Sequence, residues 1–348
     1  FFQTALYTAT GSNLSITNDG NSDLKPDLIW FKRRDSTVVN AWFNSSIGRG
    51  AFLYTPGAVA EVACAADYEL QTFDSNGFSL GLNQHGVTNS SGTRVAWQWK
   101  ANGGTTSSNT DGSITSTVQA NQDAGFSIVT YTGNGTQSGQ TVGHGLGAVP
   151  KMIISKDRGA TSNVTTWRVY HEAIGNTKYL TLNSNEAAGT YNDWDNTTPT
   201  SSVYSVGGAG GYTPTNSSGT NFLAYVFADV QGYSKFGSYV GNGSADGPFV
   251  YTGFKPAWIM RKRIDGAGSW SILDYQRNPT NLADQFLSAD ANSAESNYLD
   301  IFSIDILSNG FKFRTTRYES NQSGSTYIYM AFAENPFTTS TGIPTTAR

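Results

Sequence analysis

The chain of 348 residues repeats one pattern three times, and this repeat is the strongest constraint on its fold. Each copy opens with a tyrosine before a glycine-rich turn. A proline comes next, and a lysine follows it six positions later. Identical spacing in three places predicts three related folding units. The pairs are Pro26 and Lys32, Pro150 and Lys156, and Pro256 and Lys262.

Each copy also contains segments typical of buried strands. The residues between the proline and the lysine form a short apolar run, and a proline at the first residue of a strand removes no needed hydrogen-bond donor. Each copy ends with an Asn-x-x-Gly turn before an aromatic run, at Asn89, Asn216 and Asn321. In the last run, residues 327–332 place apolar side chains on both faces, which predicts a central strand covered on both sides.

These patterns predict an all-β fold of three tandem β-sandwich repeats. Turn signals recur about every 8 to 15 residues, and no long stretch has the apolar period of a helix. Jelly-roll and immunoglobulin-like strand orders both remain open. The expected parts are a first sandwich at residues 1–100, a Gly/Ser/Thr-rich linker at 101–125 with one strand near Ile114 and Val118, a second sandwich at 126–231, a third at 232–337, and a loose C-terminal tail at 338–348.

Two copies share a further turn. The sequence Ser-Asn-Gly-Phe occurs at residues 75–78 and 308–311, whereas the second copy has Ser-Val-Gly at 205–207. Asn-Gly supplies the two positive-φ residues of a type I′ turn, so we expect tight β-hairpins in the first and third copies.

The composition excludes several classes of protein. Charged residues make up 14% of the chain and the net charge is −4, without a basic cluster of the size that nucleic-acid binding requires. No apolar stretch is long enough to span a membrane, so we expect no membrane insertion. The single cysteine, Cys64, lies in a small apolar segment and is expected to be a buried, unreactive residue.

Four segments carry a resemblance to a known group of proteins. The sequence resembles repeat-containing proteins encoded by tailed phages of marine bacteria and cyanobacteria, which carry a domain of unknown function and are usually described as virion, tail-fibre or lectin-like proteins. The resemblance implies a viral structural setting and brings no catalytic residues. The segments are VAWQWKANGG at 95–104, VGHGLG at 142–147, YSKFGSY at 233–239 and MAFAENPF at 330–337.

The residues that could support catalysis or metal binding are few. His85, His144 and His171 do not recur between the copies and have no ligand spacing, so we expect neither a metal site nor a cofactor. A glycosidase needs two carboxylates facing one cleft, and no motif pairs the available ones. No Gly-x-Ser-x-Gly motif is present. The carboxylates considered are Glu172, Glu186 and Glu295.

One loop is a candidate glycan-binding site. Asp193, Trp194 and Asp195 place two carboxylates beside an indole, which suits stacking on a sugar or binding of calcium, although an ordinary Asx-type turn explains the same residues. Trp194 has no counterpart in the other copies. In contrast, three tryptophans follow the Pro–Lys strands at similar places, and we interpret them as core anchors. They are Trp42, Trp167 and Trp270.

Together these features predict a non-enzymatic virion structural protein on the outer surface of the particle, on a tail fibre or a head appendage. Its expected partners are other virion proteins and a host cell-surface glycan, and a homo-oligomer such as a trimer is expected by analogy with phage fibres. One alternative is a purely architectural capsid decoration or connector protein. A less favoured alternative is a surface-polysaccharide depolymerase.

Overall fold

The structure is a computed structural model that describes residues 1–159, 166–297 and 302–333. The fold is all-β, as the sequence predicts, and its sheets are antiparallel. Helical structure in the described residues is limited to short stretches such as η1 (Glu172–Ile174) and α2 (Tyr318–Asn321). The predicted tail at 338–348, and the end of the third predicted sandwich, lie outside the described residues.

The first segment, residues 1–100, forms a large six-stranded sheet and a small three-stranded sheet. The large sheet has the order β1 (Phe2–Ala9), β9 (Gly92–Trp99), β3 (Leu28–Arg33), β4 (Ala41–Asn44), β5 (Gly48–Tyr54) and β6 (Val62–Ala63). The small sheet has the order β2 (Leu14–Thr17), β8 (Gly77–Leu80) and β7 (Leu70–Asp74).

The second segment, residues 101–231, forms an eight-stranded and a two-stranded sheet. The segment predicted as a linker at 101–125 instead belongs to the large sheet, because β10 and β11 lie within it and continue that sheet beyond β12. β11 contains Val118, near which the sequence predicts one strand. The large sheet has the order β10 (Ser107–Asn109), β11 (Ser116–Asn121), β12 (Phe126–Thr132), β19 (Asn221–Phe227), β14 (Met152–Asp157), β15 (Trp167–His171), β16 (Lys178–Thr181) and β17 (Gly189–Thr190), and the small sheet pairs β13 (Gln140–Gly143) with β18 (Val203–Val206).

The third segment, residues 232–333, again forms a six-stranded and a three-stranded sheet. The large sheet has the order β20 (Ser234–Val240), β28 (Thr326–Ala333), β22 (Pro256–Arg263), β23 (Ser271–Asp274), β24 (Gln285–Ser288) and β25 (Ser296–Asn297). The small sheet has the order β21 (Phe249–Tyr251), β27 (Gly310–Phe313) and β26 (Ile304–Leu307).

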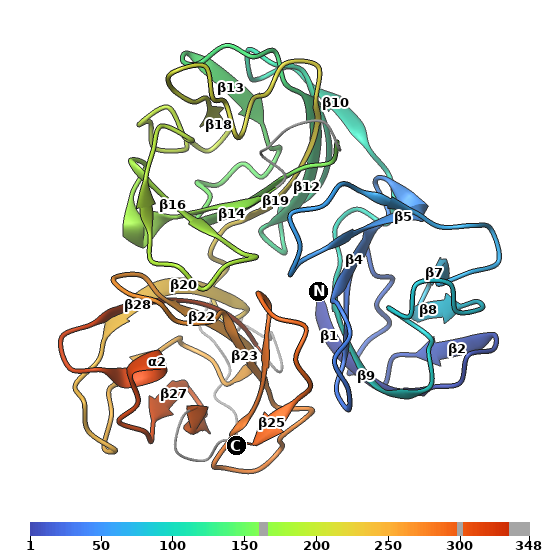
Figure 1. Ribbon diagram of the computed structural model, residues 1–348, viewed down its shortest axis with the longest axis vertical. Coiled ribbons are helices and arrows are strands. Elements are labelled where there is room, and N and C mark those ends of the chain that lie inside the picture. The colour runs from blue at the N-terminus through green and yellow to red at the C-terminus, as the bar shows by residue number, and fades with distance from the viewer. Residues whose placement is uncertain (160–165, 298–301, 334–348) are drawn as a thin grey trace.

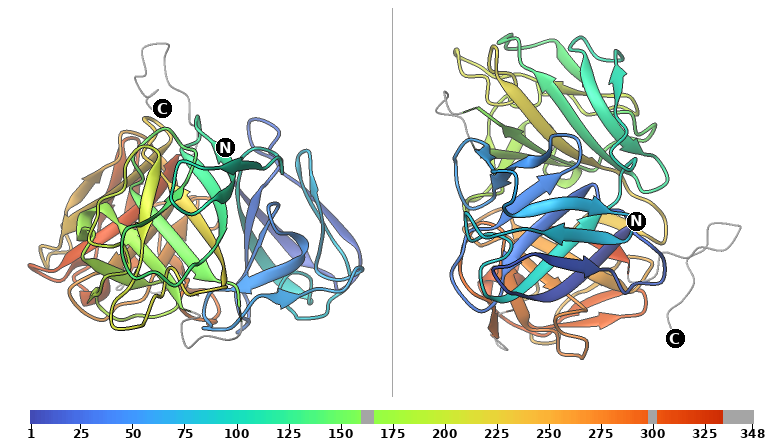
Figure 2. Two further views of the ribbon diagram at one scale, coloured as in Figure 1. Left: turned by 90° about the horizontal axis from the view of Figure 1, so that it is seen from above. Right: turned by 90° about the vertical axis from the view of Figure 1, so that its right-hand side faces the viewer.

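Each large sheet is apolar on both faces. One face packs on the small sheet of its own segment, and the other contributes to a central cluster shared by all three segments. Successive side chains of a strand point to opposite faces, so a single strand serves both clusters. In β9, for example, Trp97 lies in the central cluster and Ala96 packs toward the small sheet. The three segments therefore surround a common core, as the three lobes of Figure 1 show and the side views of Figure 2 support.

The strand register corrects the predicted equivalence of three tryptophans. All three are buried in the central cluster, which confirms their role as core residues. However, the strand pairing shows that they are not equivalent. Trp42 pairs with Trp30, which lies four positions after Pro26. In the other two segments, the residue four positions after the proline pairs with Val169 or with Ile272, and not with a tryptophan. Trp167 and Trp270 lie two positions before Val169 and Ile272, respectively. The first segment has Asn40 at this position, two residues before Trp42. Sequence spacing missed this because residues two apart on a strand share a face.

The hairpins predicted at the Ser-Asn-Gly-Phe sequences form, but their turns differ from the expectation. Asp74 pairs with Gly77, and Leu307 pairs with Gly310, so Ser-Asn and not Asn-Gly lies at the centre of each turn. Close packing requires both glycines, and Gly77 also has a positive φ of 121°. A Cβ at Gly77 would lie 2.0 Å from the Ile16 carbonyl oxygen, and one at Gly310 would lie 2.1 Å from the Val250 carbonyl oxygen. Each glycine thus lets an edge strand approach its neighbour.

The same hydrogen bonds join each segment to the next, and they close the three segments into a ring. We call the contacts seam 1–2, seam 2–3 and seam 3–1. In each seam one side chain donates to a backbone carbonyl of the neighbouring segment: Trp167 Nε1 to Tyr54 O at 2.8 Å, Trp270 Nε1 to Thr181 O at 2.9 Å, and Asn40 Nδ2 to Ser288 O at 3.2 Å. Trp167 begins β15, and Trp270 and Asn40 directly precede β23 and β4. A backbone amide returns a bond across each seam: Glu61 to Arg158 O, Ala188 to Ile264 O, and Glu295 to Arg34 O.

Each seam has a third contact, made by one residue at the same register position. This residue is Asn44, His171 or Asp274, and it pairs with the residue two positions after the repeated proline. Asn44 Nδ2 donates to the Tyr225 hydroxyl at 3.1 Å, and the indole N–H of Trp97 donates to Asp274 at 2.9 Å. At seam 2–3 the corresponding residue is His171. Its Nδ1 accepts the Ala173 N–H, so Nε2 carries the proton and faces the Tyr329 carbonyl oxygen at 3.3 Å. Three different residue types therefore serve one position.

Candidate functional site: a pocket at seam 3–1

The structure places the predicted glycan-binding tryptophan in the core. Trp194 is 1% exposed and packs edge-on against Tyr170, with 5.8 Å between the ring centroids. It belongs to the apolar cluster between the two sheets of the second segment. Because neither face of the indole reaches solvent, the prediction that Trp194 offers a stacking surface for a sugar is wrong for this structure. Its lack of a counterpart reflects a local packing difference.

The two neighbouring carboxylates also make internal contacts. Asp193 is fully buried, and its Oδ2 lies 3.5 Å from the Arg168 Nε without a hydrogen bond. Burial raises the pKa of Asp193 to about 6, against the opposing charge of Arg168. Asp195 is half-buried and accepts the Gly139 N–H at 2.6 Å. Asp193, Trp194 and Asp195 thus tie a loop to the second segment and do not form an open site.

The histidines serve as hydrogen-bonding groups. Burial lowers the pKa of His171 to about 4 and also lowers the pKa of His144. His144 faces the Thr200 carbonyl oxygen, and His85 lies beside the Ala63 carbonyl oxygen. Among the residues that the structure describes, no group of three or more His, Cys, Asp or Glu side chains could hold a metal ion.

The carboxylates considered for hydrolysis do not face one another across a cleft. Glu172 forms an exposed ion pair with Lys151, and Glu186 lies on the surface. Glu295 is held from two sides at seam 3–1, where Arg34 approaches one oxygen at 2.8 Å and Arg277 approaches the other at 2.7 Å. Both oxygens of Glu295 are therefore already engaged by arginines of the seam.

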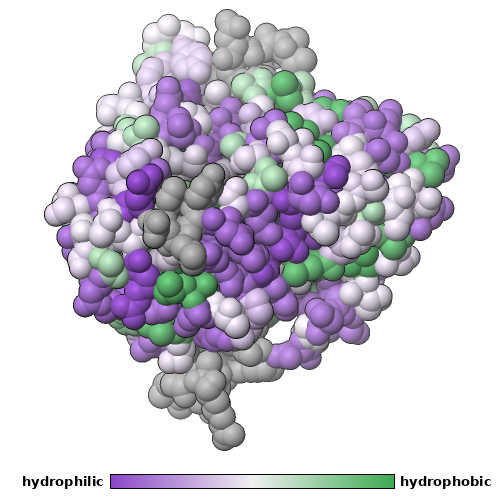
Figure 3. All heavy atoms as spheres, turned by 60° about the horizontal axis from the view of Figure 1, so that its bottom comes forward, coloured by the Kyte–Doolittle hydropathy of each residue, from purple (hydrophilic) through white to green (hydrophobic). Residues whose placement is uncertain are grey.

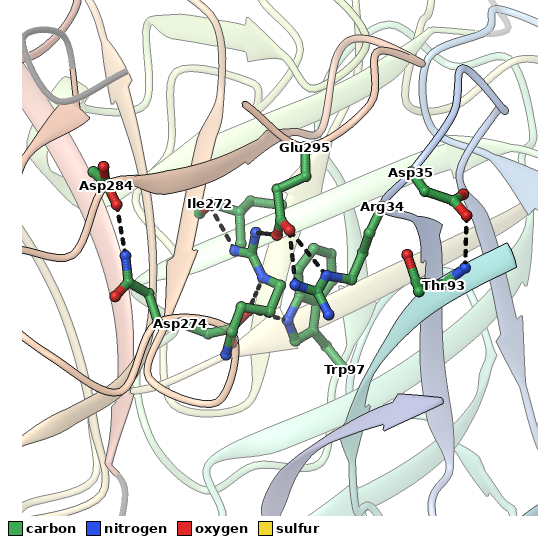
Figure 4. A network of polar contacts seen from close by, with 10 residues as sticks. Arg34, Asp35, Thr93, Trp97, Ile272, Asp274, Asp284 and Glu295 are labelled. Carbon is green, nitrogen blue, oxygen red and sulfur yellow. Dashed lines mark hydrogen bonds and ion pairs between the residues drawn. The ribbon is translucent and has the colours of Figure 1, made fainter. Parts of the chain in front are cut away.

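Glu295 belongs to a network that crosses seam 3–1 (Figure 4). Arg277 is buried and also donates to Asp274 at 2.5 Å, and the same Asp274 oxygen accepts the indole N–H of Trp97 in the first segment. The guanidinium lies 5.6 Å from the centroid of the Trp97 ring. The network therefore runs without interruption from Arg34 through Glu295, Arg277 and Asp274 to Trp97, and it fixes the relative position of the two segments.

The three repeated lysines are buried at the seams. Lys32 Nζ donates to Asn40 and, across seam 3–1, to the Ala291 carbonyl oxygen at 2.8 Å. Lys262 Nζ donates across seam 2–3 to the Asn185 carbonyl oxygen. Burial lowers the pKa of Lys32 to about 7, and the pKa values of Lys156 and Lys262 to about 8. The spacing found in the sequence thus marks a buried structural position.

A pocket of about 570 Å³ opens at seam 3–1. Its volume lies within the range of small-molecule sites. The first segment contributes mainly apolar residues and the third contributes polar ones. The lining residues are Val39, Tyr54, Pro56, Gly57 and Val59 from the first segment, and Asp290, Ala291 and Asn292 from the third.

Sequence reasoning did not identify this pocket. Its two halves are separated by more than two hundred residues, and neither half carries a motif. One indirect signal was present, because Asn40 replaces the seam tryptophan of the other segments and Val39 lines the pocket beside it. That signal becomes readable only once the strand register is known.

One face of the molecule is mostly polar. The face in Figure 3 is dominated by hydrophilic residues, with smaller hydrophobic areas between them. Large exposed apolar side chains include Leu6, Val240 and Tyr251, which belong to different strands. Within the described ranges, no helix has the length and hydropathy needed to cross a membrane.

The fold and the seams define an all-β protein whose three segments close around one core, with a pocket of about 570 Å³ at seam 3–1. A family model described as Domain of unknown function (DUF7483) matches residues 1–336, so the chain belongs to this family. No curated protein and no solved structure matches the chain.

Proposed function

We propose that the chain is a non-enzymatic structural protein of a phage virion. In this proposal it consists of three tandem β-sandwich copies, lies on the outer surface of the particle, and binds a host cell-surface glycan. The observation that carries the proposal is that the polar residues recurring in the three copies make internal structural contacts. Lys32 and Lys262 donate hydrogen bonds across seams, and Asn89, Asn216 and Asn321 each close a turn within their own segment. These contacts explain why the residues recur without assigning them a catalytic role.

The sandwich repeats are supported by the agreement of the three seams. Each seam has a side-chain bond to an edge carbonyl and a backbone bond in return, at the same register positions. Each large sheet also packs on a small sheet of its own segment. Three copies of one sandwich that face a common centre account for both observations.

The non-enzymatic part is supported by the state of the acidic residues. Glu295 and Asp274 are engaged by arginines, and Asp193 lies beside Arg168 in the core. A depolymerase would need a carboxylic acid and a carboxylate that both reach the glycosidic bond. Incubation of the purified chain with host surface polysaccharide should therefore release no reducing ends, and steady release would overturn this part of the proposal.

The setting in the particle is tested by immunogold electron microscopy of purified virions, with an antibody raised against this chain. Label on tail fibres or head appendages is the expected result, and loss of cell attachment in the presence of the antibody would support host binding. Label spread over the head, without an effect on attachment, would favour the architectural decoration or connector protein. Absence of label would overturn the virion assignment.

A further inference from the structure

The pocket at seam 3–1 combines apolar groups of the first segment with polar groups of the third. Val39, Pro56 and Val59 present aliphatic groups, and the Tyr54 ring lies among them. The ring is held edge-on against Phe52, with 4.9 Å between the centroids and an interplanar angle of 89°. A fixed aromatic ring contacts a ligand at low cost in conformational entropy, and it suits the C–H face of a sugar.

The opposite wall supplies groups that bind hydroxyls. Asp290 is anchored by the Trp270 N–H, which donates to Oδ1 at 2.8 Å. Asn292 lies beside it with an exposed amide that can donate and accept. A carboxylate accepts hydrogen bonds from hydroxyls more strongly than a neutral oxygen does. The two side chains are therefore suited to neighbouring hydroxyl groups.

The charges near the pocket offset one another. Asp290 is the acidic residue of the lining, and the amino group of the buried Lys32, whose pKa is about 7, lies behind Ala291, to whose carbonyl oxygen it donates. Asp290 lies close enough to raise the pKa of Lys32 and of Lys262 against the lowering by burial. A site with both signs of charge attracts neither an anion nor a cation strongly. This balance favours a neutral ligand.

The position of the pocket follows from the seam. At seams 1–2 and 2–3 an indole, of Trp167 or Trp270, fills the place that the shorter Asn40 occupies at seam 3–1. Asn40 donates to the Ser288 and Ala289 carbonyl oxygens of the third segment. The pocket lies beside this contact, because its lining includes Val39, next to Asn40, and residues 290–292, which follow Ala289. The 570 Å³ pocket thus lies at the seam where an amide stands in place of an indole. A smaller pocket of about 410 Å³ lies at seam 2–3 beside Asn185 and Gly268, where the Trp270 indole is present.

From these observations we infer that the seam 3–1 pocket binds a neutral saccharide, with Tyr54 and Val59 against the sugar ring and with Asp290 and Asn292 on its hydroxyl groups. The inference rests on the proposed function, which includes glycan binding, and it names the site and the class of sugar. Val59 is 46% exposed, so its side chain can be changed without disturbing the core.

The test is a titration of the purified full chain with glucose, galactose, mannose and N-acetylglucosamine, and with N-acetylneuraminic acid as a charged sugar, observed by saturation-transfer NMR. Two variants address the pocket. Val59→Arg places a long side chain next to Asp290 and fills the volume, and Asp290→Asn weakens the hydroxyl contacts. Val240→Arg is the matched control, because Val240 is 57% exposed and lies on β20 outside the pocket lining.

We expect one or more of the neutral sugars to bind, and each pocket variant to weaken binding by about tenfold or more, while Val240→Arg leaves it unchanged. Equal binding of a neutral sugar by the wild type and Val59→Arg would overturn the pocket and leave the proposed function intact. Preference for the charged sugar would overturn the inferred ligand class. If no sugar bound while virions still carried the gold label, glycan recognition would fail and the structural role would stand.

Discussion

Three buried asparagines close the same turn in each segment. Asn89, Asn216 and Asn321 each accept a backbone N–H from the glycine-rich turn after the opening tyrosine. The tyrosine hydroxyl in turn donates to a backbone carbonyl one residue before the asparagine: Tyr7 to Thr88, Tyr131 to Thr215 and Tyr239 to Ser320. The two recurring motifs of the sequence are thus one structural unit.

Replacement of one of these asparagines should be costly. Asn321 Nδ2 donates to Asn242 Oδ1, Ser244 O and Thr315 O, and its Oδ1 accepts the Asn242 N–H. Asn321→Ala leaves several of these buried partners unsatisfied, so we expect it to lower the free energy of unfolding by roughly 2–4 kcal/mol. Denaturant titration measures the change. The exposed Asn13→Ala is the control, and equal effects of the two substitutions would contradict the assigned role.

The buried Asp193 should give the protein a pH dependence. Its pKa in the folded state is about 6, above the usual value of 3.8, so between these pH values the folded state holds a proton that the unfolded state has released. The contribution of Asp193 to stability is therefore greatest at low pH and falls as the pH rises toward 6. Asp193→Asn removes this fall, and from pH 4 to 7 its stability relative to the wild type should increase by up to about 3 kcal/mol.

Measuring the stability of the wild type and of Asp193→Asn at each pH isolates the titration of Asp193. His171 and the other titrating groups contribute equally to both proteins and cancel in the difference. The attraction between ionised Asp193 and Arg168 is already included in the pKa of about 6, so its loss in the variant does not alter the expected trend. Parallel stability curves for Asp193→Asn and the wild type would show that the buried carboxylate does not titrate in this range.

At the scale of elements, the small sheets depend on glycine at the start of one strand. β27 begins at Gly310, where β21 lies so close that a Cβ would meet the Val250 carbonyl oxygen at 2.1 Å and the Phe249 ring at 2.9 Å. Gly77 holds the same place in β8. A glycine read from sequence as a turn residue is here a packing residue.

Gly310→Ala should separate β21 from β27 and lower the free energy of unfolding by about 3 kcal/mol, the upper part of the range for overpacking. Gly50→Ala is the control, because Gly50 has a φ that alanine tolerates and no atom within 4 Å of its Cβ position. Thermal unfolding by circular dichroism compares the two. A Gly310→Ala variant as stable as Gly50→Ala would mean that the edge strand relaxes without loss.

At the scale of the whole molecule, the three buried lysines couple the ring to pH. Their pKa values in the folded state are about 7 for Lys32 and about 8 for Lys156 and Lys262, below the usual 10.5. Between these values and 10.5 the unfolded state binds more protons than the folded state, so stability should rise with pH. From pH 7 to 9 each lysine should contribute about 1–2 kcal/mol to this rise.

Chemical unfolding at pH 7, 8 and 9 measures the rise. Lys262→Met removes one of the three titrating groups and should flatten the curve, whereas the exposed Lys178→Met should leave its slope unchanged. A wild-type stability that falls between pH 7 and 9, or a Lys262→Met curve with the wild-type slope, would refute the coupling.

The sequence alone was sufficient for the all-β class and for the core positions of Trp42, Trp167 and Trp270, because alternating apolar runs and turn residues depend on neighbours along the chain. It also located Lys32, Lys156 and Lys262 by spacing, without their burial. It indicated a strand near Val118, where β11 lies, but it missed β10, because the Ser and Asn residues of β10 resemble a linker until a neighbouring strand pairs with them.

Only the tertiary structure decided which residues face solvent and which meet across the seams. Trp194 looked available because it has no counterpart, but its burial depends on Tyr170 and the sheets around it. Tyr54 and Asp290 meet at a pocket because the third segment returns to the first and closes the ring. The alternation of apolar and polar residues along a strand depends only on neighbours in the sequence. Which side chains are exposed, and which distant residues come into contact, depends on how the sheets pack against one another, and no local pattern specifies that packing.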